Sequence, residues 1–569
     1  MERIGVVKEV GGAARVIDSF GDRRALRAMP EAPVGSWVLA RDGEVVQLLA
    51  EPGSGLADLY AIAARAGISP LHDEACLAEA SALVGAPGID DPALVDLSAL
   101  PLVTIDEVSS KDLDQAVCIE ASGDGFVVWY ALADASWFIR PGMALYEAAL
   151  ARGSSYYLPG LVLPMLPAVL SEDLISLNPA VDRRAMVFEL HLDSAGRLSE
   201  KRLHRARVRC RHKLAFDWVQ SFLDGEPVDW DADVQASLRL LREVGERRIR
   251  LAEERNVIRY RRAEVDVHLD GRSFIALDGP RNDVERYNEQ ISLLTNIEGA
   301  RFLLAGDTDD DHIQPIYRVH EAPGEERFAE LRASITEITR LHGLDAKIWV
   351  WEPDSEGLNA YLERLPDTAV ARAIHRQAMI ANRPSHYAST PGLHYGVGAD
   401  VYGRFTAPMR EVVGIFLHNE AWEKLRGAPF DVPAGYEGDA LRERVIASSN
   451  KARMLQRKFD REANRLVLDD LFAEAKSSGR LEEGTVLGVT STRVHVQLDS
   501  PRIDVKVYVP HIEKQWSVEL SASKAKTALL DSAGEVRLRI GDRVRLGVTG
   551  RDHKRDRWEL DLKRLGTEA

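Results

Sequence analysis

The sequence contains little cysteine and no long apolar run. Its three cysteines among 569 residues lie far apart, without the paired spacing of a disulfide framework or a zinc site. No stretch of about eighteen apolar residues could span a bilayer, and the start MERIGVVKEV lacks the apolar core of a signal peptide. A Walker loop, an internal repeat and a low-complexity tract are also missing. We therefore expect a soluble, cytoplasmic protein that does not associate with membranes.

Positive charge is in the minority. Lys and Arg number 73 against 89 Asp and Glu, which gives a formal net charge of -16. A protein that coats nucleic acid over its whole surface needs the opposite balance. A local basic channel is still compatible with these numbers, because contact with phosphate depends on where Lys and Arg gather. The length and the 45% hydrophobic content predict several globular domains.

Residues 1–90 have a pattern of their own. Four strand-like runs, GVVKEV, ARVIDS, SWVLAR and EVVQLLA, are broken by Gly and Pro. Two helical patterns follow, LADLYAIAARAG and LHDEACLAEASALV, joined by a short turn. Such a pair is typical of a helix-turn-helix that binds nucleic acid, and equally of a structural αα-hairpin. We expect a small β-rich region followed by a helix-turn-helix-like pair.

The densest acidic motif is TIDEVSSKDLDQAV, which places Asp106, Asp112 and Asp114 within nine residues. LVTID reads as a strand, VSSK as a turn and DLDQAVCI as a second strand, on which Asp112 and Asp114 share one face. Clustered carboxylates raise one another's pKa unless a cation lies between them, and hard oxygen ligands suit magnesium or manganese. The alternative is an ordinary acidic turn in contact with water.

This motif resembles the signature of the ribonuclease II family of exoribonucleases, in which Ile-Asp is followed after five residues by Asp, an apolar residue and two acidic residues. Gln115 is the departure, since the family usually has its last Asp there. The resemblance continues in family order from Leu102 to about Arg426, through the segments YYLPGLVLPMLP, RYNEQISLLTN, IYRVHEAP and FTAPMR. After FTAPMR it weakens, because Glu411, Val412 and Gly414 differ from the family pattern.

The resemblance implies an α+β multidomain fold. Residues 91–430 would form a mixed α/β catalytic domain of the RNB type, and residues 431–480 a helical segment that completes it. Residues 481–569 would form an RNA-binding OB-fold β-barrel of the ribosomal-protein S-one type, with a generic β-barrel as the alternative. Members usually carry two cold-shock barrels before the catalytic domain, and residues 1–90 are too few to form them.

The resemblance also implies roles for single residues. Magnesium, or manganese in its place, would be held by Asp106, Asp112, Asp114 and Gln115, the last through a neutral amide oxygen. Arg410 would stabilise charge on the phosphate, with Asp112 and Asp114 as the other catalytic residues. The residues implied to contact RNA are Tyr157 and Tyr260, which stack on bases, Phe216, in place of a ribose-sensing Tyr, Glu289, near the ribose, and Arg259. For Tyr157 the alternative is a side chain that only packs beside prolines.

A basic run, KRLHRARVRCRHK, covers residues 201–213 and places Lys or Arg at mostly alternate positions. Along a strand these residues would form one basic face. That face could follow a phosphate backbone, or it could protect an edge strand by its charge.

The function implied is that of a monomeric 3′-to-5′ hydrolytic exoribonuclease that degrades single-stranded RNA and releases nucleoside 5′-monophosphates. The alternative is a catalytically weakened RNA-binding regulator that keeps the fold, and Gln115 is the residue that favours it. A further hypothesis is that the N-terminal helix pair extends the substrate range to structured RNA with a 3′ overhang.

Overall fold

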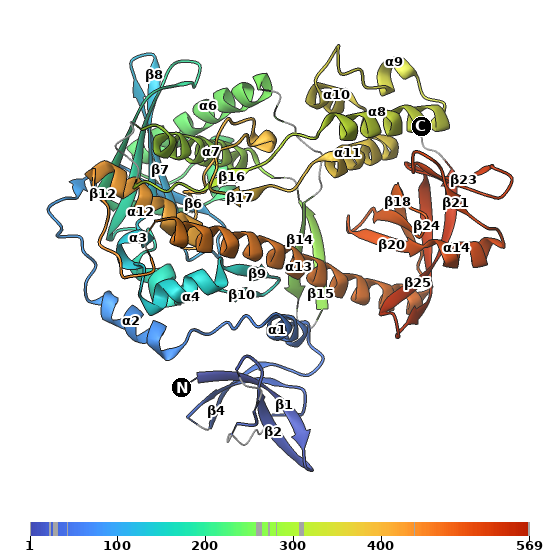
Figure 1. Cartoon of the computed structure of the whole chain (residues 1–569), viewed down its shortest axis with the longest axis horizontal. Coiled ribbons are helices and arrows are strands. Elements are labelled where there is room, and N and C mark those ends of the chain that lie inside the picture. The colour runs from blue at the N-terminus through green and yellow to red at the C-terminus, as the bar shows by residue number, and fades with distance from the viewer. Residues whose placement is uncertain are drawn as a thin grey trace. The chain divides into compact units, whose positions relative to one another are not determined.

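The computed structural model describes residues 2–21, 24–26, 32–42, 44–255, 257, 264–270, 273–279, 281–306, 312–436 and 438–566. Two compact units interleave along the chain (Figure 1). Unit 1 comprises Met1–Arg255, Arg281–His320 and Ser385–Asp460, and unit 2 comprises Asn256–Pro280, Glu321–Pro384 and Arg461–Ala569. Among the helices of the described residues, none combines the length and the apolar character that crossing a membrane would require.

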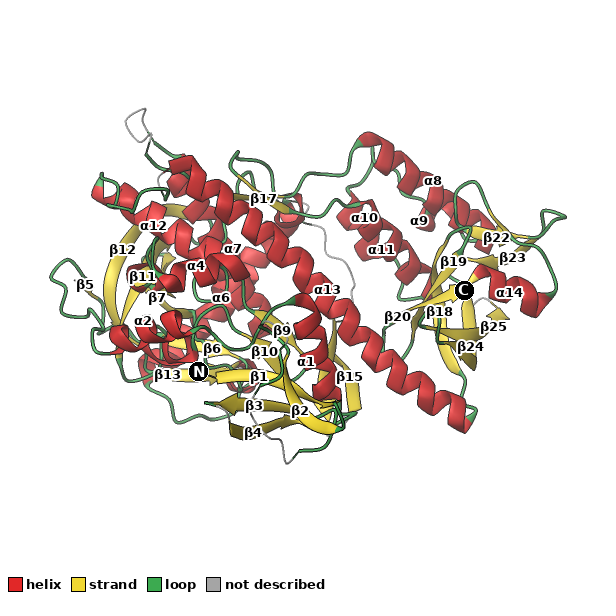
Figure 2. Cartoon of the chain, turned by 60° about the horizontal axis from the view of Figure 1, so that its bottom comes forward, coloured by secondary structure: helices red, strands yellow, loops and turns green. Residues whose placement is uncertain are grey.

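Unit 1 begins with a four-stranded antiparallel sheet in the order β2-β1-β3-β4 (Figure 2). Its core consists of small β-branched and Ala side chains, Val7, Val16, Val38 and Ala40. All four predicted strands are confirmed, as β1 (Glu2–Val10), β2 (Ala13–Asp18), β3 (Trp37–Arg41) and β4 (Glu44–Ala50).

The predicted helix pair is present as α1 (Gly55–Ala66) and α2 (Glu74–Val84). Helix α2 is capped by Asp73, whose side chain accepts the Cys76 N–H. It is fixed to α4 (Ala144–Arg152), because the carboxylate of Glu79 accepts the N–H groups at the start of α4 at 3.0 and 2.9 Å. This contact is structural. It gives α2 a packing role, whereas a nucleic-acid-binding role stays a prediction.

A mixed seven-stranded sheet forms the centre of unit 1, in the order β13-β6-β7-β8-β11-β12-β5. The pairs β6–β13 and β5–β12 are parallel and the others antiparallel. The strands are β5 (Val95–Asp96), β6 (Val103–Asp106), β7 (Gln115–Ser122), β8 (Gly125–Ala133), β11 (Asp182–Leu192), β12 (Leu198–Arg209) and β13 (His212–Ala215).

Helices and short strands surround this sheet. Helix α6 packs on β7 and on α7 (Figure 1). The other elements of unit 1 are α3 (Ala135–Phe138), β9 (Tyr156–Leu158), β10 (Leu161–Leu163), a π-helical turn (Val169–Leu174), α5 (Phe216–Leu223), α6 (Ala232–Glu254), α7 (Asp283–Leu304), β16 (Tyr317–Val319), β17 (His386–Ala388), a 3-10 turn (Tyr395–Val397), α12 (Val412–Arg426) and the first half of α13 (Gly438–Ser478).

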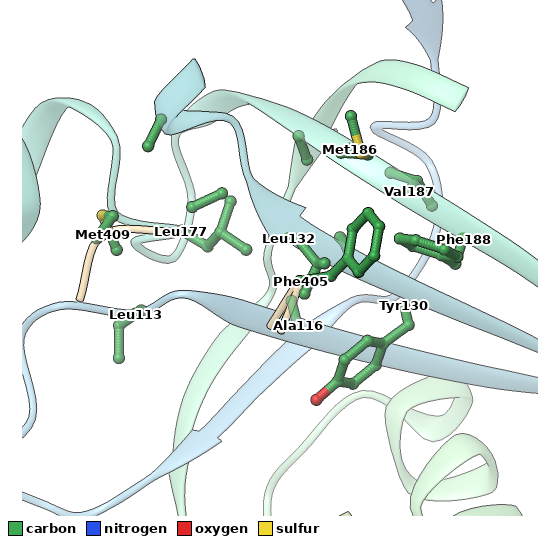
Figure 3. Packing of buried hydrophobic residues seen from close by; sticks show 14 of the residues in the cluster. Leu113, Ala116, Tyr130, Leu132, Leu177, Met186, Val187, Phe188, Phe405 and Met409 are labelled. Atoms are coloured by element: carbon green, nitrogen blue, oxygen red, sulfur yellow. The ribbon is translucent and has the colours of Figure 1, made fainter. Parts of the chain in front are cut away.

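The core of unit 1 joins the sheet to the segment that precedes α12 (Figure 3). Phe188 of β11 and Phe405 meet edge to face, with ring centroids 5.9 Å apart. Leu113, just before β7, and Met409, four residues after Phe405, are also buried in this cluster. Packing therefore brings the Asp cluster and FTAPMR, two motifs about 300 residues apart, into one site.

Unit 2 contains the hairpin β14–β15, a group of helices and a C-terminal β-region. A five-stranded antiparallel sheet has the order β20-β19-β18-β24-β25, so β20 and β25 are its edges. The described strands thus form an OB-like sheet that backbone hydrogen bonds do not close into the predicted barrel. The elements are β14 (Glu264–Asp270), β15 (Ser273–Gly279), α8 (Glu325–His342), α9 (Ala346–Trp349), α10 (Leu358–Arg364), α11 (Ala369–Ala381), β18 (Glu482–Val489), β19 (Arg493–Leu498), β20 (Asp504–Tyr508), α14 (Val509–Trp516), β21 (Ser521–Ala522), β22 (Ala528–Leu530), β23 (Val536–Arg539), β24 (Arg543–Asp552) and β25 (Arg557–Gly566).

The basic run over residues 201–213 lies on β12 and β13, as expected, but intramolecular contacts compensate most of its charge. Arg205 donates to the buried Asp134 from Nε at 2.6 Å and from Nη2 at 2.9 Å. Further ion pairs of Lys and Arg in the run are Lys201 with Glu298, Arg202 with Glu189 and Glu200, Arg207 with Asp96 and Arg209 with Asp182. The structure does not support the prediction that this run is a free face for phosphate.

We predict that Phe188→Ala destabilises unit 1 by about 3–5 kcal/mol, because it removes a buried ring and leaves a cavity against Phe405. Hydrogen–deuterium exchange of the β8 and β11 amides measures this loss locally. Val181→Ala, at a side chain that is 41% exposed just before β11, is the matched control and should change protection by no more than about 0.5 kcal/mol. Equal protection in the two variants would contradict the assigned core.

Candidate active site

The three acidic residues lie around the turn between β6 and β7. Asp106 is the last residue of β6, and Asp112 and Asp114 lie in the loop before β7, which begins at Gln115. The prediction that both loop residues lie on a strand is therefore wrong. Tertiary contacts override the local alternation here, since the Ser176 hydroxyl accepts the Leu113 N–H at 3.0 Å and holds the loop off the ladder.

Lys213 of β13 fixes the rest of this loop. Its ammonium group donates to the backbone carbonyl of Val108 at 2.9 Å and also to that of Ser110. Strand β13 is in place because it pairs in parallel with β6, where Ala215 is the partner of Asp106. Phe216 is the residue after Ala215 and begins α5. Its role with ribose stays a prediction.

Asp114 is only 1% exposed, and both of its carboxylate oxygens accept hydrogen bonds. The Met409 N–H donates to Oδ1 at 2.9 Å, and the Arg410 Nε donates to Oδ2 at 2.5 Å. Burial raises the pKa of Asp114 to about 6, against the lowering effect of Arg410. Asp114 and Arg410, both predicted to be catalytic, thus form a salt bridge in which the carboxylate is buried and the guanidinium is partly exposed.

Asp106 and Asp112 keep oxygens available for a ligand. No described residue donates a hydrogen bond to the Asp106 carboxylate, whose pKa burial raises to about 7, with Arg410 opposing the shift and Asp114 and Asp112 adding to it. The Tyr157 hydroxyl donates to Asp112 Oδ2 at 3.2 Å. Tyr157 itself is 44% exposed, so its ring faces open space as well as the site.

Gln115 has one lone pair of its amide oxygen already engaged, because the hydroxyl of Tyr130 donates to Oε1. Tyr130 lies on β8 and is fully buried in the core cluster (Figure 3). Burial raises the pKa of its phenol, and the nearby Asp106 raises it further. Gln115 is therefore held by the core, and its predicted role as a neutral metal ligand would use the second lone pair.

The number of available carboxylates in the site suits magnesium. Within the described part of the chain, no three His, Cys, Asp or Glu side chains lie close enough to enclose a metal ion. Magnesium seldom needs such a cage, because it usually binds through one or two carboxylates together with waters and substrate phosphates. Asp106 and Asp112 fit that pattern, whereas the oxygens of Asp114 are engaged by Met409 and Arg410.

Of the remaining residues predicted to contact RNA, the structure describes Glu289 but neither Tyr260 nor Arg259. Glu289 lies on α7 and forms an ion pair with Arg281 at 3.4 Å. Tyr260 and Arg259 lie outside the described residues. Their predicted contacts with RNA, like that of Glu289, stay predictions.

Sequence reasoning missed a group of arginines beside Arg410. Arg318, Arg404 and Arg453 line one cavity with Arg410, Tyr157 and Glu411. Arg318 and Arg404 lie inside the family segments IYRVHEAP and FTAPMR or directly before them, but nothing in the sequence showed that their side chains converge.

Comparison with known proteins identifies the family. The model of the RNB domain matches residues 94–423, more than half of the chain. The chain belongs to the RNB-domain family. Ribonuclease R of Vibrio cholerae is 31% identical over 438 residues, which cover 74% of this chain and 51% of that relative. The chain thus spans about half the length of this curated relative.

Solved structures with an RNB-like fold extend the match beyond residues 94–423. Ribonuclease R of Mycoplasma genitalium, in complex with ribose-methylated single-stranded RNA, superposes with a TM-score of 0.79 at 21% identity, over 99% of this chain and 90% of that one. Yeast Ssd1, described as a pseudonuclease, gives a TM-score of 0.60 at 14% identity, over 93% of this chain and 67% of that one. Both likenesses concern the fold, which agrees with the predicted α+β multidomain class.

We predict that cation binding to the acidic cluster strengthens as the pH rises from 6 to 8. The cation needs ionised carboxylates, and the pKa of Asp106, about 7, means that the cation must displace a proton at the lower pH. Calorimetric titration with magnesium or manganese, without RNA, measures the change. Asp106→Asn should weaken binding and flatten its pH dependence, and an unchanged pH dependence in that variant would contradict the assignment.

Proposed function

We propose that the chain is a 3′-to-5′ hydrolytic exoribonuclease that degrades single-stranded RNA and releases nucleoside 5′-monophosphates. The observation that carries the proposal is the arrangement of two available carboxylates, Asp106 and Asp112, next to an arginine that a third carboxylate holds in place. Membership of the RNB-domain family supports it. Magnesium is the cation we propose, with manganese as its substitute.

In this proposal the residues of the chain position the terminal phosphodiester. Magnesium, held by Asp106 and Asp112, would supply a water with a lowered pKa. Asp114 engages Nε of Arg410 and leaves the two terminal nitrogens of that guanidinium for phosphate oxygens. These donors can offset the charge that grows on the phosphate in the transition state.

Tyr157 would stack on a base close to the 3′ end. Its backbone is fixed by Gln456 of α13, which accepts the Tyr157 N–H at 3.1 Å and donates to the Tyr157 carbonyl at 3.0 Å. Its hydroxyl reaches Asp112, so a base stacked on the ring would lie beside the acidic cluster.

A second candidate is an RNA-binding regulator without catalysis. Gln115 favours it, because the resemblance predicts a carboxylate there and the amide brings no charge to the site. The likeness to Ssd1 shows that the fold also occurs in a protein described as a pseudonuclease. The presence of Asp106, Asp112, Asp114 and Arg410 in one site favours the enzyme.

The test is a time course on a 5′-labelled single-stranded oligoribonucleotide, with magnesium and with a chelator. We expect magnesium-dependent shortening from the 3′ end and release of nucleoside 5′-monophosphates. Asp114→Asn should lower turnover at least about 100-fold, because Arg410 loses its charged partner. Asp124→Asn, the same chemical change in the exposed turn between β7 and β8, is the control and should keep the wild-type rate.

Tight binding of the oligonucleotide without shortening, with magnesium or manganese present, would support the regulator instead. Circular dichroism and RNA binding of Asp114→Asn show whether that variant is folded. A folded Asp114→Asn protein with near-native turnover would contradict the assigned role of the Asp114–Arg410 pair.

We further predict that Tyr157→Ala raises KM for RNA about 5- to 150-fold, since a base stack contributes about 1–3 kcal/mol. Tyr157→Phe keeps the ring and loses only the hydroxyl contact with Asp112, so its KM should stay close to that of the wild type. Steady-state kinetics on one oligonucleotide compare the two variants. A KM for Tyr157→Ala equal to that of Tyr157→Phe would mean that the ring does not stack.

A further inference from the structure

The cavity beside Arg410 is strongly basic. It has a volume of about 300 Å³ and is lined by the side chains of Tyr157, Arg318, Arg404, Arg410, Glu411 and Arg453, all from unit 1. A volume at the lower end of the roughly 300–1,000 Å³ range of small-molecule sites suits one nucleotide or a part of it. Arg410 and Tyr157 belong both to this cavity and to the acidic site, so the two adjoin.

Three guanidinium groups of the cavity are held in place through Nε, and their terminal nitrogens are available as hydrogen-bond donors. Arg404 donates from Nε to Glu411 at 2.8 Å, Arg318 from Nε to the Ser385 hydroxyl at 3.3 Å, and Arg410 from Nε to Asp114. Within the described chain, the terminal nitrogens of these three arginines donate to no protein atom. Three planar guanidinium groups therefore line one cavity, and the N–H groups on their terminal nitrogens are available to a ligand.

The charge of the cavity is only partly balanced. Glu411 compensates Arg404 and Asp114 compensates Arg410, whereas Arg318 and Arg453 have no carboxylate partner among the residues described. Both of these arginines are held by Ser385, to which Arg453 donates at 2.5 Å and 2.8 Å. Burial lowers the pKa of Arg453 to about 10, and the like charge of Arg318 contributes to the shift.

Glu411 cannot supply more compensation, because both of its oxygens are used. Arg404 Nε donates to Oε1, and the hydroxyl of the buried Tyr387 donates to Oε2 at 2.7 Å. Although burial by itself would raise the pKa of Glu411, Arg404, Tyr387 and Arg318 hold it at about 2. The carboxylate is therefore a fixed part of the wall, and the excess positive charge is left for a ligand.

We propose that this cavity, lined by Arg318, Arg404, Arg410 and Arg453, is a binding site for a phosphomonoester, namely the 5′-phosphate of the released nucleotide. The identity of the ligand as the product rests on the proposed function, whereas the preference for a phosphomonoester rests on the cavity itself. Hydrolysis converts a phosphodiester with one negative charge into a monoester with about −1.5 to −2 charge at pH 7. A site with two uncompensated arginines favours the more highly charged group.

The position of the cavity agrees with this role. Arg410 has two terminal nitrogens, so it can contact the phosphate both before and after hydrolysis while Asp114 holds its Nε. If the product phosphate moves toward Arg318 and Arg453, it leaves the acidic cluster, where the carboxylates of Asp106 and Asp112 repel its negative charge. The arginines would thus separate the product from the carboxylates.

The test is calorimetric titration of the full chain with adenosine 5′-monophosphate, in the presence of a chelator so that no cation bridges the ligand. Adenosine and adenosine 5′-methylphosphate, a diester of nearly the same size, are the comparison ligands. We expect the monophosphate to bind at least tenfold more tightly than either. Arg318→Gln should weaken its binding roughly tenfold, and Arg318→Lys, which keeps the charge and loses the fork, should have an intermediate effect.

Lys451→Gln is the matched control, since Lys451 is exposed on α13 two residues before Arg453 and does not line the cavity. It should bind adenosine 5′-monophosphate as the wild type does. Thermal melts show whether Arg318→Gln is folded, and Arg453→Gln provides a second variant of the same wall. Binding of adenosine 5′-monophosphate that is unchanged in both arginine variants would overturn the proposal. Equally tight binding of adenosine 5′-methylphosphate would also overturn it, because the cavity would then be a site for a phosphate of the RNA backbone.

The outcome is separable from that of the nuclease test. A chain that shortens RNA but does not bind adenosine 5′-monophosphate would overturn the phosphomonoester site and leave the proposed function intact. Arg318-dependent binding of the monophosphate by a chain that shortens no RNA would support the site and overturn the proposed reaction.

Discussion

The buried hydrogen bond from Arg410 to Asp114 is the interaction on which the site depends. It joins residues 296 positions apart, and it is supported by the Met409 N–H, which donates to the other oxygen of the same carboxylate. Loss of Arg410 would leave the buried Asp114 carboxylate without its cationic partner, at a cost of about 3–5 kcal/mol. Because Leu113 and Met409, the neighbours of this pair, are themselves buried, the packing of unit 1 fixes the orientation of the arginine.

The rest of the acidic site is held together against its own repulsion. Asp106 is placed by the parallel pairing of β6 with β13, and the loop that carries Asp112 is fixed by Lys213 and Ser176. Burial raises the pKa of Asp106, Arg410 opposes the shift, and repulsion from Asp114 and Asp112 adds to it, so an ionised carboxylate is costly at this position. The acidic cluster thus lowers the stability of the folded protein locally. Binding of a cation and a phosphate at the same place would offset this loss.

The sequence was sufficient for the features that depend on local pattern or on motif order. It predicted the four N-terminal strands, the helix pair, a helical segment where the structure has the single helix α13, and the set of acidic residues around Arg410. It did not predict where Asp112 and Asp114 lie, because the alternation in DLDQAV is typical of a strand, and the contacts that hold the segment in a loop come from residues distant in sequence, such as Ser176 and Lys213. The compensation of the basic residues on β12 was equally invisible, since their partners come from other parts of the chain.

Two of the departures of the chain from the family pattern, Gln115 and Glu411, can be understood from the balance of charge. Asp114 is already neutralised by Arg410, so Asp106 and Asp112 are the two carboxylates that remain, and one divalent cation would compensate them. A carboxylate at position 115 would require further positive charge, whereas the amide is satisfied by Tyr130. On the other side of Arg410, Glu411 neutralises Arg404 and so limits the repulsion among four arginines. Each departure therefore lowers the uncompensated charge of one half of the site, and the acidic and basic halves stay distinct on either side of Arg410.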